Sequence, residues 1–279
     1  MSHYKTILVH LPDARRAERL LSFAARLAAA HDAHLIGLFV MPAQVLAPAF
    51  GVGRGYLEAG LKAIKSQAAA IEAIFEQTAA GLQLKKEWRF VDPGHRPAQD
   101  VVMAHVRTAD LVIVSQRDSS WDDNLLLESP EDIVMASGRP TIVVPNAGDA
   151  GAAGKRITVA WNDRREAARA TFDALPLLQR ADNVRLLWIN PENERIDEGD
   201  IPTAEIAATL ARHGVKATAA AVHGADNGVG QLLLQELRKD NSDLLVMGAF
   251  GHTRLREMVF GGATRHVFKN LHVPVLLSH

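Results

Sequence analysis

Short runs of aliphatic and β-branched residues alternate along the chain with longer segments in which apolar side chains recur every three or four positions. The positions at helical spacing are Leu20, Phe23, Ala24 and Leu27 in the first half and Ala167, Thr171, Ala174 and Leu178 in the second. A short apolar run predicts a buried strand, and the longer spacing predicts the core face of a helix. The alternation therefore predicts βαβ units, with a parallel sheet covered by helices.

The pattern predicts ten strands in two sets of five. They cover residues 5–11, 33–40, 86–91, 110–115 and 140–145, and then 155–161, 183–189, 215–222, 242–248 and 273–278. Residues 43–80 have no counterpart in the second half. They contain a GVGRG run at Gly51–Gly55, followed by an alanine-rich helical pattern that starts at Leu57. Because the glycines neither follow a strand nor directly open a helix, they predict a mobile loop rather than a nucleotide-binding turn.

The two halves repeat one unit. TILVHLPD at residues 6–13 matches RITVAWND at 156–163, at an offset of 150 residues. ADLVIV at 109–114 matches SDLLVM at 242–247 at an offset of 133, so the first copy carries extra residues in its middle. A glycine- and alanine-rich segment without periodicity separates the copies and reads as a flexible linker. The predicted division is domain 1 at 1–147, a linker at 148–154 and domain 2 at 155–279.

Composition narrows the functional classes. The 279 residues are 48% hydrophobic and 23% charged, as expected for a soluble globular chain. A formal net charge of −1 gives no general attraction to nucleic acid or to anionic lipid. The chain has no cysteine, which excludes disulfides, thiolate metal sites and cysteine nucleophiles. Without a leader pattern or an apolar run of membrane-spanning length, we expect a cytoplasmic protein that contacts neither membrane nor nucleic acid.

A glycine-spaced loop carries the candidate chemistry. The strand ending at Met247 runs into Gly248 and Gly251, and nine residues later the chain reaches Gly261 and Gly262, followed by Thr264 and a helical pattern. Parallel sheets bind ligands at the carboxyl ends of their strands, and glycine lets backbone N–H groups approach a phosphate closely. A helix N-terminus adds N–H donors and a partial positive charge. This loop therefore predicts a phosphate-binding site.

The spacing of Gly248, Gly251 and Gly261, together with the repeat and the terminal VPVLL strand, resembles the universal stress protein family over the whole chain, in a tandem arrangement. The resemblance implies two flavodoxin-like, HUP-type α/β domains, each with a five-stranded parallel sheet. In that family the pattern G-x2-G-x9-G-(S/T) holds the ribose and phosphates of ATP, which implies ATP, with Mg, as the ligand of the second copy. The implied binding residues are Gly248, Gly251, Gly261, Gly262, Thr264, Asn162 and Asp163.

Two positions depart from the family pattern. ATP-binding members carry an aspartate after the first strand, where this chain has Asn162 followed by Asp163. They carry Ser or Thr after the third glycine, where this chain has Gly262, and Thr264 stands two residues further on. Asparagine still donates and accepts hydrogen bonds, and Gly262 keeps its backbone N–H. Nucleotide binding stays the leading interpretation, and the alternative is that the glycines only permit a tight strand-to-helix turn.

The first copy differs at the aligned loop. Ser115, Asp118, Leu127 and Glu128 stand where the second copy has its glycines. Residues 115–132 hold one arginine and six acidic residues, whereas 248–266 hold three arginines and one glutamate. Acidic side chains repel phosphate and compete for the same donors, so we expect no ATP in the first copy. The segment from Ser129 also reads as an ordinary helix start, with Ser as N-cap and Pro at the first position.

Other candidate sites are weak. No histidine pair has the spacing of a helical metal site, so no metal site is predicted, and no known nucleophile or P-loop motif occurs. Asp13 and Asp163 follow the first strand of each copy and are expected to cap the next helix. Trp161 and Trp188 could line a base pocket, although filling the edge of the core is the commoner role. No catalytic residue is predicted.

The terminal strands 139–145 and 273–278 are apolar edges that would be exposed if left unpaired. We expect them to lie side by side, so that the chain forms an intramolecular pseudo-dimer; a further homodimer stays open. The leading function is an adenine-nucleotide-binding stress-response module with an unknown protein partner. The alternatives are a nucleotide-independent interaction protein with a remnant glycine loop, and a slow ATPase in which Asp163, Asn162 or a histidine positions water. Enzymatic activity is less expected than binding.

Overall fold

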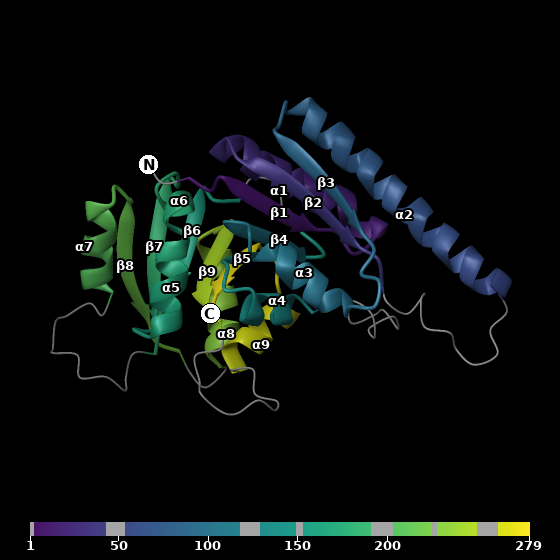
Figure 1. The fold of residues 1–279 in the computed structure, drawn as a ribbon. Coiled ribbons are helices and arrows are strands. Elements are labelled where there is room, and N and C mark those ends of the chain that lie inside the picture. Colours follow the sequence, from purple (N-terminus) through teal and green to yellow (C-terminus); the bar gives the residue numbers. More distant parts are fainter. Residues whose placement is uncertain are drawn as a thin grey trace. The chain divides into compact units, whose positions relative to one another are not determined.

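The computed structural model describes residues 3–42, 54–117, 129–148, 153–190, 203–224, 228–249 and 262–279. Residue contacts divide the chain into an N-terminal unit, His3–Arg139, and a C-terminal unit that comprises Pro140–His279 together with the first two residues. Figure 1 gives the order of the elements along the chain. No helix of the described ranges is long and apolar enough to cross a membrane.

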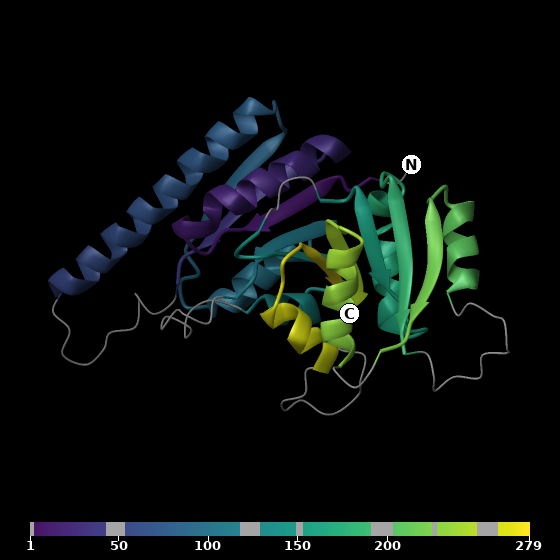
Figure 2. The same ribbon diagram turned by 180° about the vertical axis from the view of Figure 1, so that it is seen from behind.

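The N-terminal unit is a parallel sheet with helices on its faces. Its elements are β1 (Thr6–His10), η1 (Ala14–Arg16), α1 (Ala17–His31), β2 (His34–Val40), α2 (Arg54–Gly81), β3 (Lys86–Val91), α3 (Ala98–Val106), β4 (Leu111–Ser115) and α4 (Pro130–Ala136). The strands run parallel in the order β3-β2-β1-β4. Helices α1 and α2 contact each other and cover one face of this sheet, as Figure 2 shows.

Helix α2 has 28 residues and accounts for most of the segment that the second copy lacks. A single stripe at helical spacing is buried, at Ile64, Ala68, Ile71, Phe75 and Ala79. Phe75 stacks at 5.6 Å from Trp88 of β3, which fixes the helix on the sheet. The predicted alanine-rich helix is therefore confirmed, but it begins at Arg54 rather than Leu57, so the expectation of a loop at Gly55 is wrong. Residues 51–53 of the GVGRG run lie outside the described residues.

The C-terminal unit repeats the same layout. Its elements are β5 (Thr141–Val144), β6 (Arg156–Ala160), α5 (Arg165–Asp173), α6 (Leu175–Leu178), β7 (Asn183–Ile189), α7 (Ala204–Arg212), β8 (Ala217–Val222), α8 (Val229–Lys239), β9 (Leu244–Gly248), α9 (Gly262–Lys269) and β10 (Val275–Ser278). Five strands run parallel in the order β10-β9-β6-β7-β8. Figures 1 and 2 show α5 on one face of this sheet, with α8 and α9 on the other.

The burial of each strand explains why the pattern predicted it. The central strands β1, β4 and β9 are buried at four of their five positions and consist mainly of Val, Ile and Leu, because helices cover both faces. Strand β6 is buried at its three middle positions. The outer strands β3 and β8 have no fully buried position, and each is exposed at two of its six residues. All ten predicted strands are present, with ends within two residues of the prediction. The tandem α/β fold with parallel sheets is confirmed.

Strand β5 comes from the first sequence copy but belongs by its contacts to the C-terminal unit. It pairs antiparallel with β10, so that Val143 lies opposite Val275 and Thr141 lies opposite Leu277. The expectation that these two apolar strands lie side by side is confirmed. Their pairing leaves neither of the two facing edges exposed.

Candidate functional site

The C-terminal unit contains a cavity of about 500 Å³ at the carboxyl ends of β6 and β9. These strands are neighbours, but the chain leaves β6 towards β7 and leaves β9 towards β10, so the strand order reverses between them. Such a reversal opens a crevice in which open α/β sheets bind ligands. The size of the cavity lies within the range of small-molecule sites. The lining residues are Ala160, Trp161, Asn162, Glu166, Ala167, Leu187, Ile189, Gly228, Val229, Gly230, Gln231, Leu233, Met247, Gly248, Gly262, Ala263, Thr264 and His266.

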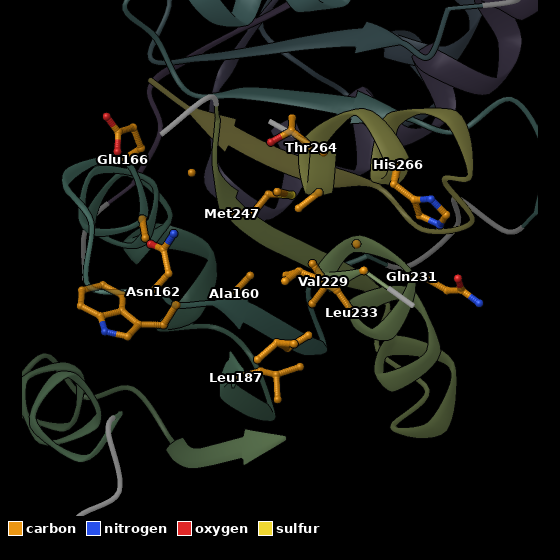
Figure 3. Close-up of a pocket in the computed structure, with 18 residues that line it drawn as sticks. Ala160, Asn162, Glu166, Leu187, Val229, Gln231, Leu233, Met247, Thr264 and His266 are labelled. Carbon is orange, nitrogen blue, oxygen red and sulfur yellow. The ribbon is translucent and has the colours of Figure 1, made fainter. Parts of the chain in front are cut away.

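The cavity brings together four of the predicted site residues from three separate places in the sequence. Asn162 follows β6, Gly248 ends β9, and Gly262 and Thr264 belong to the first turn of α9. Figure 3 shows Asn162 and Thr264 on different walls, with Val229 of α8 on a third. Gly251 and Gly261 lie outside the described residues. The cavity thus has one wall at the end of β6 and another at the start of α9.

The wall beside β6 and β7 is mostly apolar. Trp161 continues β6, and its backbone N–H donates to the carbonyl of Leu187 at 2.9 Å. Leu187, Ile189 and Ala160 line the same side of the cavity. Trp188, in contrast, is 8% exposed and belongs to the core. Of the two tryptophans considered from the sequence, Trp161 therefore lines the cavity and Trp188 fills the core edge.

Asn162 has a local structural role as well as a place in the cavity wall. Its side-chain Oδ1 accepts a hydrogen bond from the backbone N–H of Arg164 at 3.2 Å, which forms a turn before α5. Asp163 takes a left-handed conformation, with φ at 54°, and is not among the residues that line the cavity. Helix α5 has no side-chain N-cap, so the expectation that Asp163 caps it is wrong. The side chain of Asn162, the residue before Asp163, makes the hydrogen bond that stabilises this turn.

In the first copy the corresponding capping prediction is confirmed. Asp13 is the N-cap of η1, and its Oδ1 accepts from the backbone N–H of Arg15 at 2.8 Å. Ser129 likewise caps α4, with its Oγ accepting from the backbone N–H of Asp132 at 3.2 Å. Ser115 ends β4, whereas Asp118, Leu127 and Glu128 lie outside the described residues. In this copy, the side chains of Asp13 and Ser129 thus accept hydrogen bonds from backbone N–H groups at the starts of helices.

Gly248 is required by packing. A Cβ at this position would lie 2.5 Å from the backbone nitrogen of Ala167 and 2.5 Å from the carbonyl carbon of Glu166. Both atoms belong to the first turn of α5, so the helix can approach the end of β9 only because Gly248 has no side chain. This contact accounts for the glycine without any ligand. Tight packing alone is thus sufficient to explain why residue 248 is a glycine.

Gly262 differs in this respect. No heavy atom of the described residues lies within 4 Å of a Cβ built on it, and its φ is not in the left-handed region. Gly262 opens α9, and Thr264 in the same turn is 5% exposed. The first turn of a helix directs N–H groups and a partial positive charge beyond its N-terminus. The open space at Gly262 leaves this end of α9 accessible from the cavity.

Glu166 brings a negative charge to the cavity wall and was missed in the sequence pattern. It is 5% exposed and pairs with Arg165. Burial alone would raise the pKa of its carboxyl, but the hydrogen bond from Arg165, its own backbone N–H and the charges of Arg165 and His279 outweigh burial and lower that pKa. The carboxylate is therefore ionised at neutral pH. The signal in the sequence that could have identified Glu166 is its place directly after Arg164 and Arg165, at the start of a helix.

Two further lining elements were also missed. Gly228 and Gly230 open α8, and Gln231 and His266 lie on the adjoining turns of α8 and α9. A pair of glycines at the start of a helix that follows the third strand is the signal that could have identified them. Among the residues that the structure describes, no group of three or more His, Asp or Glu side chains could hold a metal ion.

Comparison with known proteins places the chain in a family. The model of the universal stress protein family matches residues 3–145 and again residues 154–279. No curated protein matches. A universal stress protein from Archaeoglobus fulgidus DSM 4304 has a similar structure, with a TM-score of 0.75 at 14% identity over 98% of this chain and 95% of that one.

Two proteins from Pseudomonas aeruginosa are also similar in fold. The first, described as a putative universal stress protein from strain UCBPP-PA14, has a TM-score of 0.59 at 16% identity and covers 99% of this chain and 93% of its own. The second, a functionally unknown protein from strain PAO1, has a TM-score of 0.55 at 15% identity, with coverages of 99% and 92%. Since the family model matches nearly the whole chain in two copies, this chain belongs to the universal stress protein family, in tandem form.

Proposed function

We propose that the cavity of the C-terminal unit binds one adenine nucleotide, ATP with Mg, and that the protein is a cytoplasmic stress-response module regulated by this ligand. The observation that carries the proposal is the convergence of Asn162, Gly248, Gly262 and Thr264 on one cavity of about 500 Å³ where the strand order reverses. Membership of the universal stress protein family supports the same assignment.

The two ends of the cavity suit the two ends of a nucleotide. The apolar wall of Ala160, Leu187 and Ile189, together with Trp161, offers a surface for a planar base. The accessible start of α9 at Gly262 offers backbone N–H donors for phosphate. Asn162 follows β6 and lines the same cavity, and we expect its amide to reach the nucleoside. From the sequence pattern, we propose that Gly251 and Gly261 also contribute to phosphate binding.

A nucleotide-independent interaction protein is the second candidate, because packing against α5 fully accounts for Gly248. In that case the loop is a remnant of the fold and the cavity holds no nucleotide. We propose binding rather than turnover. The described side chains of the cavity include one carboxylate, Glu166, which is already paired with Arg165. The chain is proposed to divide at 148–154, with the β5–β10 ladder joining the two copies as a pseudo-dimer.

Calorimetry with Mg-ATP tests the proposal. One nucleotide per chain is expected, and Gly251→Asp should abolish binding because its carboxylate opposes the phosphates. Asp118→Asn and Glu128→Gln, at the aligned loop of the first copy, should leave the affinity unchanged. Two nucleotides per chain, or one that survives Gly251→Asp, would place the site elsewhere. No binding at millimolar Mg-ATP would favour the interaction protein.

A second variant uses the open space at the start of α9. Gly262→Val adds a branched side chain at the start of α9, where a Cβ would meet no described atom within 4 Å. We expect a loss of ATP affinity of about tenfold or more with an unchanged melting temperature. Gly55→Val is the matched control, since Gly55 lies in the first turn of α2 and a Cβ there also meets no atom within 4 Å.

A further inference from the structure

Gly230 lies at the second position of α8, against the first turns of α9. A Cβ at Gly230 would lie 2.8 Å from the carbonyl oxygen of Ala263, 2.9 Å from Cβ of His266 and 3.1 Å from Cα of Ala263. Two of these atoms are backbone atoms, which cannot rotate away as the tip of a long side chain can. Any side chain at Gly230 must therefore push the start of α9 and α8 apart.

No local feature of the chain accounts for a glycine at this position. Gly230 is helical and its φ is not in the left-handed region, so the backbone conformation does not require it. Glycine is also among the weakest helix formers, and alanine at the same position would favour the helix. The close approach of α9 is thus the physical reason for this glycine.

Helix α8 is held in place from the sheet side, so a displacement falls mainly on α9. Leu233, Leu234 and Leu237 are buried by 98% or more of their surface. Arg185 of β7 donates to Oε2 of Glu236 at 2.8 Å and also pairs with Asp240. These contacts tie the middle and the C-terminal end of α8 to the sheet. Helix α9 has only eight residues, and its first turn forms the cavity wall at Gly262, Ala263 and Thr264.

We propose that Gly230 is a positioning residue, which sets the first turn of α9 at the distance where its N–H groups reach the phosphate part of the ligand. The inference rests on the proposed function and assigns to α8 a share in recognising the anionic end. Hydrogen bonds to phosphate depend steeply on distance, so a shift of several tenths of an ångström weakens them. The three atoms nearest to a Cβ at Gly230 all belong to α9 and none to the apolar wall beside β6 and β7, although Gly230 itself also lines the cavity. We therefore expect recognition of the base to change much less than recognition of the phosphates.

The test compares the wild type with Gly230→Ala and uses three ligands in calorimetry or thermal shift, namely Mg-ATP, adenosine and inorganic tripolyphosphate. We expect Gly230→Ala to lower the affinity for Mg-ATP and for tripolyphosphate by roughly tenfold, and the affinity for adenosine by less than about twofold. If Gly230 were needed only for stability, its replacement would lower the affinities for all three ligands by the same factor or leave all three unchanged. Gly55→Ala is the matched control, because Gly55 is the second residue of α2 and meets no atom within 4 Å.

The outcomes separate this inference from the proposed function. If the wild type binds Mg-ATP and Gly230→Ala leaves its affinity unchanged, or weakens adenosine by the same factor, Gly230 has no positioning role and the proposed function stands. If the wild type binds none of the three ligands, both proposals fail. Circular dichroism and urea unfolding of Gly230→Ala establish that the variant is folded, and the higher helix propensity of alanine favours this.

Discussion

The two copies place different side chains at the carboxyl ends of the same strands. Strand β1 ends in His10, which is 6% exposed, whereas the aligned β6 ends in Ala160, which lines the cavity. The next residue is Leu11 in the first copy, fully buried, and Trp161 in the second, part of the cavity wall. The imidazole of His10 thus occupies volume where the second copy has a methyl group. A shared strand order does not by itself produce a shared site.

The neighbouring strand differs in a matching way. Gly248 ends β9 and admits the first turn of α5, whereas Ser115 ends β4 and carries a side chain. In the first copy the chain leaves β1 through the short helix η1, whose start is capped by Asp13. The helix start that approaches β9 in the second copy is therefore replaced by a capped turn in the first. The copies therefore differ in how closely the first helix approaches the neighbouring strand, and this close approach in the second copy is the reason for Gly248.

The largest effect is expected from Gly248→Ala. Because the new Cβ would contact backbone atoms of α5 at 2.5 Å, the variant should lose about 3 kcal/mol of unfolding free energy in urea titration. Ser115→Ala is the matched change at the end of β4 and should cost less than about 0.5 kcal/mol. Equal effects of the two substitutions would show that the close approach of α5 does not constrain this position.

A pH-dependent loss of stability should come from His10 in the first copy. Burial lowers the pKa of His10 to about 4 from its ordinary value of 6.5. The unfolded chain then binds the proton first, so stability falls as the pH drops below 6.5 and continues to fall until about pH 4. Between pH 7 and pH 5 the loss attributable to His10 is about 2 kcal/mol.

Urea titrations at pH 7, 6 and 5 measure this loss. His10→Leu should remove it, so that the variant depends less on pH than the wild type does. His95→Leu, at an exposed histidine before α3, should keep the wild-type dependence. A His10→Leu chain that loses as much stability in acid as the wild type would assign the effect to other groups.

The smallest effect concerns the carboxylate in the cavity wall. Glu166→Gln removes a buried negative charge from the site proposed for an anionic ligand and should raise the affinity for Mg-ATP by about threefold. The affinity for uncharged adenosine should stay the same. Calorimetry at low ionic strength measures both, and Glu205→Gln on the exposed side of α7 is the control. Weaker ATP binding would indicate that Glu166 contacts the ligand directly or through Mg.

The sequence was sufficient for the strands because their signal is local. Runs such as TILVH and LLVMG are apolar on both sides of the strand, and this is visible within five residues. The helix from Leu57 was equally visible, since its stripe repeats over several turns. The capping of η1 by Asp13 follows from local spacing as well. These features depend on neighbours in the sequence.

The site was only partly predictable because it depends on neighbours in space. Motif spacing pointed to Gly248, Gly262 and Thr264, and all three line the cavity. The reason for Gly248 lies in α5, about 80 residues earlier, and the reason for Gly230 lies in α9, more than 30 residues later. A periodic sequence pattern predicts neither of these contacts between distant parts of the chain. Asp163 was wrongly expected to cap α5, because the left-handed residue in that turn could not be distinguished from the residue before it.

The pairing of β5 with β10 also has a consequence for the order of events during protein synthesis. Val144 ends β5, and β10 begins 131 residues later. At ordinary translation rates the ribosome needs roughly ten seconds to add that much chain. The edge of β5 that β10 covers therefore waits unpaired on the nascent polypeptide for this whole interval. The C-terminal unit therefore cannot complete this antiparallel ladder until β10 has been synthesised.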